Sequence, residues 1–211
     1  MYHSFSENSG KYHRSPTIFR KHVKNVSIDE NLVITIDDGV PRVFTIAFPI
    51  LQEYNVKSII FLDTKEIGKS RMNIEQIKEM SEMGHNFQSH SHTHRSHFSL
   101  SRKEIEEEGI ISKDIIEQIT GKKVTKYCFP HSLYSTNMCE ILSQIGYSEF
   151  YTGDYGWKSR YYKGKYKIFD RIDVFKEIDD IRYFLRRDII VRKRFRGIIS
   201  KIKNWEFKYK H

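Results

Sequence analysis

Short apolar runs alternate with amphipathic segments between residues 31 and 145 of the chain. The apolar, β-branched runs predict strands at 31–36 and 57–62, residues 85–91 lead into a third strand end, and residues 123–129 are again extended. The amphipathic segments repeat their apolar residues at helical spacing and predict helices at 43–54, 73–83, 101–119 and 135–145. Strands that alternate with helices in this way indicate parallel βα units in a sheet or barrel.

Cap and turn residues mark the ends of these elements. Ser101 and Glu104 form a capping-box pattern at the start of the third helix, and Gly84 and Gly146 follow the second and fourth helices. The first strand stops at residues 37–39, which read Asp-Asp-Gly. In parallel α/β folds, ligands gather at the C-terminal ends of the strands, so we expect the chemistry of this chain there.

The chain is long enough, at 211 residues, for one compact domain, which we predict at residues 1–180. Residues 181–211 predict a basic amphipathic C-terminal helix that carries much of the net charge of +9. This helix either packs its apolar stripe on the domain or lies on an anionic membrane or polymer surface. Nucleic acid is a disfavoured partner because no recognisable binding motif accompanies the charge.

The sequence carries no export or membrane signal. It has no run of about 20 apolar residues that could span a membrane, and residues 1–10 lack the apolar segment of a signal peptide. As written, the chain is expected in the cytoplasm. Cys128 and Cys139 are too few for a disulfide framework and are interpreted as ordinary thiols.

Two adjacent carboxylates, Asp37 and Asp38, end the first predicted strand. Strand alternation points them to different sides, so they can serve different roles, although Asp-Asp-Gly is also ordinary turn chemistry. In a metallohydrolase, one such carboxylate binds the metal ion and the other acts as the general base on a water molecule.

Five of the ten histidines lie between residues 85 and 97. His90 and His94 are four residues apart, so they can meet one ion from adjacent helical turns or from a tight loop. A strand would instead align His90, His92 and His94 on one face, and a plain surface run of histidines is the non-functional alternative. Two histidines with one carboxylate leave a coordination position open for water, as catalytic zinc sites do.

These residues resemble the first two motifs of the polysaccharide deacetylases, the family 4 carbohydrate esterases. Residues 35–39 read Thr-Ile-Asp-Asp-Gly, against Thr-Phe-Asp-Asp-Gly in the family, and residues 90–94 match its His-Ser/Thr-x-x-His motif. The resemblance implies that Asp37 is the catalytic base and that Ser91 supports the loop by hydrogen bonds. It also implies one divalent ion, Zn²⁺ or else Co²⁺, Ni²⁺ or Mn²⁺, held by Asp38, His90 and His94. The implied fold is α/β, a distorted (β/α) barrel of about seven parallel strands.

The third motif departs from the family pattern, which is Arg-x-Pro-Tyr or a Phe-x-Tyr-Pro variant. Residues 127–131 read Tyr-Cys-Phe-Pro-His, without the arginine. The resemblance assigns Pro130 to substrate binding and the backbone N–H of His131 to stabilising an oxyanion. Arg171 lies in a segment similar to an Arg-Ile-x-Val strand of surface-polysaccharide members. It either orients Asp37, binds substrate, or is a plain surface arginine.

The general acid is not identified by the motifs. The late Leu-x-His motif of the family has no match, because the only histidine after His131 is His211. A leaving amine must still be protonated. His131, His3 and the protonated Asp37 are the three candidates for this role.

The sequence thus predicts a metal-dependent hydrolase that removes N-acetyl groups from an N-acetylhexosamine glycan. The glycan could be poly-N-acetylglucosamine, a capsule or lipopolysaccharide intermediate, peptidoglycan or chitin. One alternative is a degenerate relative that binds metal and glycan without catalysis. Another is a metallohydrolase of an O-acetyl ester or a non-sugar amide. The family works mostly outside the cytoplasm, which conflicts with the location expected from the sequence as written.

Overall fold

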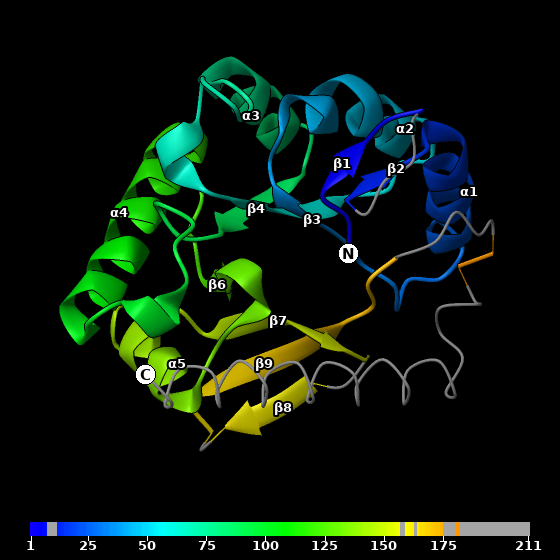
Figure 1. Cartoon of the computed structure of the whole chain (residues 1–211). Helices are drawn as coiled ribbons and strands as arrows, with labels where there is room; N and C mark the ends of the chain where they lie inside the picture. The colour runs from blue at the N-terminus through cyan, green and yellow to red at the C-terminus, as the bar shows by residue number, and fades with distance from the viewer. Residues whose placement is uncertain (8–11, 157–158, 163, 175–179, 182–211) are drawn as a thin grey trace.

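A curved sheet of seven strands forms the centre of the molecule in the computed structural model, which describes residues 1–7, 12–156, 159–162, 164–174 and 180–181 (Figure 1). In spatial order the strands are β3 (Ile34–Asp38), β4 (Ser58–Leu62), β5 (Asn86–Ser89), β6 (Lys126–Cys128), β7 (Glu149–Tyr155), β9 (Tyr166–Arg171) and β8 (Ser159–Tyr162). Neighbours pair in parallel from β3 to β9, and β8 pairs with β9 in antiparallel fashion. The predicted α/β fold is confirmed; of the about seven parallel strands that the resemblance implied, β3 to β7 and β9 are parallel and β8 is antiparallel.

Helices line the outer side of this sheet (Figure 1). They are α1 (Pro16–Val26), α2 (Phe48–Glu53), α3 (Ile74–Glu82), α4 (Arg102–Thr120) and α5 (Thr136–Gln144). A π-helical turn, Val43–Ala47, leads directly into α2. Pro49, near the start of α2, has no N–H to continue an α-helical hydrogen-bond ladder across this junction, which favours the irregular turn before it. Within the described ranges, none of the helices combines the length and apolar character needed to cross a membrane. Apart from Ile181, the predicted basic helix at 181–211 lies outside the described residues.

Strands β3 to β6 are largely buried, as expected for parallel strands, whereas the antiparallel edge strand β8 is partly exposed. Successive strands contribute fully or almost fully buried side chains to one core cluster: Ile36, Ile60, Phe87, Tyr127 and Phe150. Stacking these apolar side chains fixes the register of the strands, because a shift by one residue would turn them to the opposite face. The C-terminal ends of β3 to β6 therefore meet at one edge of the sheet.

Residues 1 and 2 lie between β3 and the residues that directly follow β9. The N–H of Tyr2 donates to Thr35 O (2.9 Å), and the N–H of Asp37 donates to Tyr2 O (2.9 Å). On the other side, Met1 N donates to Ile172 O, just beyond β9, at 2.7 Å. The strands formed by the described residues do not close into a ring, but residues 1–2 connect β3 with the end of β9.

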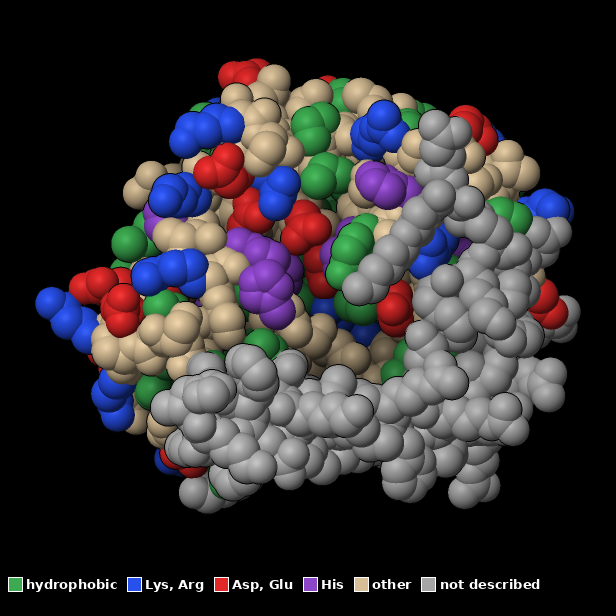
Figure 2. All heavy atoms as spheres, in the orientation of Figure 1, with side chains coloured by type: hydrophobic (Ala, Val, Ile, Leu, Met, Phe, Trp, Pro, Cys, Tyr) green, Lys and Arg blue, Asp and Glu red, His purple; other side chains and the backbone are tan. Residues whose placement is uncertain are grey.

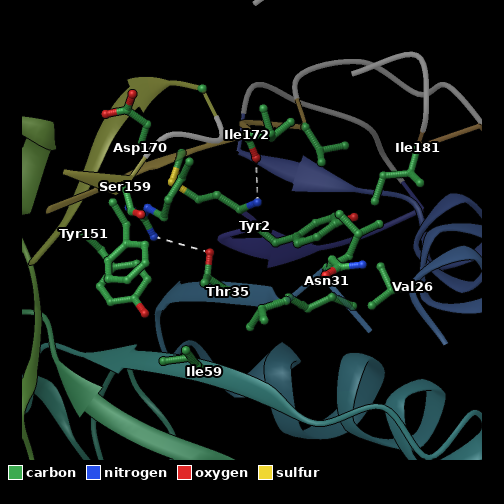
Figure 3. A pocket seen from close by; sticks show the side chains of 18 residues that line it. Tyr2, Val26, Asn31, Thr35, Ile59, Tyr151, Ser159, Asp170, Ile172 and Ile181 are labelled. Atoms are coloured by element: carbon green, nitrogen blue, oxygen red, sulfur yellow. Dashed lines mark hydrogen bonds between the residues drawn. The ribbon is translucent and has the colours of Figure 1, made fainter. Parts of the chain in front are cut away.

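A cavity of about 340 Å³ lies at this junction (Figure 3). Tyr2, Thr35, Tyr151 and Ile172 are among the side chains around it, together with Arg171. None of the predicted metal ligands is among the residues that line it. The cavity therefore does not contain the predicted metal ligands, although Arg171 both lines it and contacts Asp37.

Candidate metal centre and active site

The three predicted metal ligands, Asp38, His90 and His94, meet at the C-terminal ends of β3 and β5. His90 Nε2 lies 3.6 Å from Asp38 Oδ1, His94 Nε2 lies 3.4 Å from the same oxygen, and the two Nε2 atoms are 3.3 Å apart. Figure 2 shows histidine side chains gathered beside acidic ones at the centre of this face. Ligand atoms about 2.1 Å from one ion at tetrahedral angles are separated by roughly 3.4 Å. The donor set therefore fits a single divalent ion. Residues 90–94 form a loop after β5, so they are not the strand that would have aligned His90, His92 and His94 on one face.

The orientation of His90 is fixed from behind. Its Nδ1 lies 2.8 Å from the carbonyl oxygen of Cys128 at the end of β6, so Nδ1–H donates there and Nε2 faces the centre. Burial lowers the pKa of His90 to about 4, although the nearby carboxylates of Asp37 and Asp38 oppose the shift. The imidazole is therefore neutral at neutral pH, which is the form that binds a metal ion.

The backbone around the centre adopts conformations that non-glycine residues rarely take. Among the described residues, six non-glycine positions have positive φ, and five of them lie at this site: Asp38, Ser91, His94, His131 and Ser132. Left-handed conformations of this kind persist only where surrounding contacts hold them, and they cluster at functional sites. Some of the contacts that hold the histidine loop come from Thr64 and Lys65, which follow β4, and others come from α4.

Glu108 of α4 is the acceptor at the centre of the histidine loop. Its buried carboxylate accepts hydrogen bonds from the N–H groups of His92 and Thr93, each at 2.8 Å, and from the hydroxyl groups of Ser91 and Thr93. Burial alone would raise the pKa of Glu108, but these hydrogen bonds outweigh it and lower the pKa to about 2. Ser91, predicted to support the loop, thus donates a hydrogen bond to Glu108, a residue that the sequence alone did not identify.

Replacing Glu108 with glutamine is expected to weaken Zn²⁺ binding by about 10–100-fold, the usual effect of losing a partner that orients metal ligands. The neutral amide cannot accept four hydrogen bonds from the loop with the strength of a carboxylate. Titration against a chromophoric chelator measures the affinity. Glu107→Gln, an exposed neighbour paired only with Lys103 among the described residues, is the matched control. Equal affinities in the two variants would contradict a role for Glu108 in positioning.

Asp37 forms a buried ion pair with Arg171 of β9. Nη1 of the arginine lies 2.6 Å from Oδ1, and Nη2 lies 2.8 Å from Oδ2. Burial would raise the pKa of Asp37, but the charge and the hydrogen bonds of Arg171 outweigh it and hold the pKa below its ordinary value of 3.8. Arg171 is only 6% exposed and also donates to Thr152 O (2.9 Å). It is therefore not a surface arginine, and its contacts favour the orienting role over substrate binding.

Two histidines lie within reach of these groups. His3 Nε2 is 3.9 Å from Asp37 Oδ2. His131 Nε2 is 3.2 Å from His94 O, and the ring of His131 lies 4.7 Å from the ring of His94. Pro130, predicted to bind substrate, is buried at the start of a short 3₁₀ turn, Pro130–Ser132. The structure brings all the predicted catalytic and metal-binding residues to one site.

Known proteins show the same combination of sequence and fold. The family model for polysaccharide deacetylases matches residues 24–150, more than half of the chain. YxkH of Bacillus subtilis (strain 168), whose name assigns it provisionally to the polysaccharide deacetylases, is 29% identical over 130 residues. That match covers 61% of this chain and 47% of YxkH, so the chain corresponds to about half of this relative's length.

Solved structures share the architecture. The Streptococcus pyogenes deacetylase PplD, solved in complex with acetate, superposes with a TM-score of 0.69 at 20% identity, covering 74% of this chain and 83% of PplD. A de-N-acetylase from Aggregatibacter actinomycetemcomitans gives 0.70 at 15% identity, covering 87% of this chain and 97% of its own. At these identities the likeness establishes the fold.

Proposed function

The chain belongs to the polysaccharide deacetylase family, and from this membership we propose that it is a metal-dependent hydrolase of N-acetylhexosamine residues in a glycan. One observation carries the proposal. A buried carboxylate, Asp37, lies directly beside a three-residue donor set that fits one divalent ion. A base next to an open metal position is an arrangement that can hydrolyse an unactivated amide.

Asp38, His90 and His94 are the residues that would hold the ion. When bound, a divalent ion supplies Lewis-acid polarisation of the acetyl carbonyl and a water molecule of lowered pKa. Zn²⁺ suits two imidazoles and one carboxylate, and Co²⁺, Ni²⁺ or Mn²⁺ are the alternatives. Asp38 and His94 are partly exposed, so the centre can be reached by a substrate.

Asp37 takes the proton from the attacking water, since Arg171 keeps its carboxylate ionised and fixes its orientation. The peptide N–H of His131 is proposed to donate to the oxyanion that forms when the acetyl carbonyl becomes tetrahedral. The left-handed φ of 56° at His131 is the local backbone feature that supports this role. Collapse then releases acetate and an amine, which must receive a proton.

His3 is the candidate that we favour as the general acid. Its ring nitrogen is 3.9 Å from the carboxylate of Asp37, so the proton taken by Asp37 can pass through His3 to the leaving amine. We expect His3→Ala to lower kcat for an N-acetylated sugar by about 10²- to 10⁴-fold. The loss should be small with an aryl acetate, because its phenolate leaves without a proton. His131→Ala is the comparison. If this variant loses kcat only with the N-acetylated sugar, and His3→Ala keeps its kcat, the general acid is His131.

The proposal is tested first by metal content. Mass spectrometry of tag-free protein is expected to find about one ion per chain, as for a mononuclear catalytic site. His90→Ala should lose it, whereas His92→Ala should keep it, because Nδ1 of His92 instead lies 2.9 Å from the hydroxyl of Thr64. Acetate release from N-acetylglucosamine oligomers should follow the metal content. Protein that neither contains nor takes up a metal ion would refute the proposal.

The substrates used in that assay also separate the alternatives. Acetate released only from O-acetylated sugars, or only from non-sugar amides, would assign the same centre to another acyl group. Metal and glycan binding without acetate release would identify a degenerate, non-catalytic member. The predicted contact of residues 181–211 with an anionic membrane or polymer stays a prediction, since those residues, apart from Ile181, are not described.

A further inference from the structure

A second set of metal-binding groups lies beside the proposed centre. Asp37, His90 and Cys128 offer ligand atoms that all lie within 4.8 Å of one another. All three residues are buried, with exposures of 2%, 3% and 0%. His90 belongs to both sets, so the two share one imidazole and cannot both be filled through its Nε2.

We propose that Asp37, His90 and Cys128 bind a thiophilic divalent ion, such as Cd²⁺ or excess Zn²⁺, in an inhibitory position that competes with the catalytic ion. The inference rests on the proposed function through the shared His90. It assigns Cys128, so far an ordinary thiol, a role in the choice and control of the metal. The ion in this position would occupy Asp37 and so remove the general base.

The geometry of the set fits such an ion. Cys128 Sγ lies 3.6 Å from Asp37 Oδ2. A sulfur at about 2.3 Å and an oxygen at about 2.1 Å from one tetrahedral ion are separated by roughly 3.6 Å. The carbonyl of Cys128 holds the other nitrogen of His90 at 2.8 Å, so the same residue both orients the shared imidazole and offers the sulfur.

The charges also balance in the second position. Binding replaces the S–H bond of Cys128 with a metal–sulfur bond and releases one proton to water, without any oxidation or reduction. The thiolate, Asp37 and Asp38 then carry three negative charges, which the divalent ion and Arg171 neutralise. Burial raises the pKa of the Cys128 thiol, so the ion itself must displace the proton, and Nη2 of Arg171, 3.0 Å from Sγ, stabilises the thiolate that forms.

Ligand softness distinguishes the two positions. Asp38, His90 and His94 offer only oxygen and nitrogen, whereas the second set adds a thiolate, which favours thiophilic ions. We therefore expect Cd²⁺ to move toward Cys128, whereas Mn²⁺ should stay in the oxygen and nitrogen set. The result would be a deacetylase that thiophilic ions inhibit through an internal ligand.

The test is a Cd²⁺ titration of the full chain, followed by the ultraviolet charge-transfer absorption of a Cd²⁺–thiolate bond. Wild type and Cys139→Ser should both show the band, because Cys139 is the other cysteine and lies in α5, outside the set. Cys128→Ser should lose it, and Cys128→Ala serves as a second thiol-free variant in case the serine unfolds the buried site. No band in wild type, or a band that survives in both Cys128 variants, would overturn the proposal.

Two further measurements separate this proposal from the proposed function. Asp38→Asn removes a ligand of the catalytic set only, so its thiolate band should persist. Cd²⁺ inhibition of acetate release should require at least about 10–100-fold more Cd²⁺ in Cys128→Ser than in wild type. A Cd²⁺ band in a protein that releases no acetate when loaded with Zn²⁺ in the absence of Cd²⁺ would refute the deacetylase activity and leave the second site intact. Acetate release without a band would refute only the second site.

Discussion

Replacement of Asp37 by asparagine is expected to lower kcat for acetate release by about 10²- to 10⁴-fold, the usual contribution of a general base. The amide keeps the size of the side chain and an oxygen for Arg171, but it cannot accept the proton of the attacking water. Because this proton moves only in the transition state, we expect KM to change little, so that kcat and kcat/KM fall together. Steady-state acetate release from N-acetylglucosamine oligomers measures both constants.

Asp38→Asn is the matched control, since it changes the neighbouring carboxylate in the same strand. Asp37→Asn should retain the metal ion, and Asp38→Asn should lose it, because Asp38 belongs to the donor set with both histidines. The opposite pattern of metal content would exchange the roles of the two aspartates. An Asp37→Asn enzyme with nearly full kcat would show that another group acts as the base.

The elements that sequence analysis predicted are those with strong local signals. The capping box of Ser101 and Glu104 is present at the start of α4, with the side chain of each residue bonded to the backbone of the other. The extended segments predicted around β3, β4, β5 and β6 each lie in the sheet. Their ends shifted by a few residues, because strand limits depend on pairing with neighbours. Asp37 and Asp38 themselves pair with β4 and so belong to β3.

Helix α1 shows a signal that was present but not used. The sequence prediction assigns no element to residues 16–26, although Ser15 caps the helix and Pro16 starts it. The buried residues are Phe19, His22, Val23 and Val26, which follow helical spacing. Charged residues between them hide this stripe in a simple reading of hydropathy. The spacing of these buried residues would have predicted the helix, although the segment is polar on average.

The site divides in the same way into local and distant parts. Asp38 sits in one short motif, and His90 and His94 in another, so the sequence could predict the metal set. The partners that orient them are distant in sequence: Arg171 is 134 residues from Asp37, and Glu108 is 17 residues from Ser91. Such contacts depend on tertiary packing. Glu108 did carry a weak signal, since helical spacing from Ile105 and Ser112, both buried, places it on the inner face of α4.

Replacement of Arg171 by methionine is expected to lower the free energy of unfolding by roughly 3–5 kcal/mol at neutral pH, as for other buried ion pairs that lose one partner. Asp37 would be left as a buried carboxylate without its bidentate donor. Urea unfolding followed by circular dichroism measures the change. Arg171→Lys keeps the charge but not the two parallel hydrogen bonds, so we expect it to recover part of the stability and activity. Equal stability of wild type and Arg171→Met would contradict the importance of the pair.

The pH dependence tests whether Arg171 acts through Asp37. In wild type the folded pKa of Asp37 lies below its ordinary value of 3.8, so this group stabilises the fold above that pH and the contribution is lost as the pH falls through the folded value. Without Arg171, the largest opposition to burial is lost, so we expect the pKa of Asp37 to rise from its wild-type value. The stability difference between wild type and Arg171→Met should therefore be largest near neutral pH and shrink in acid.

The acid limb of kcat/KM should also move to higher pH in the variant, because protonated Asp37 cannot act as a base. A profile that falls uniformly at all pH values would instead indicate a structural role for Arg171 that is independent of Asp37.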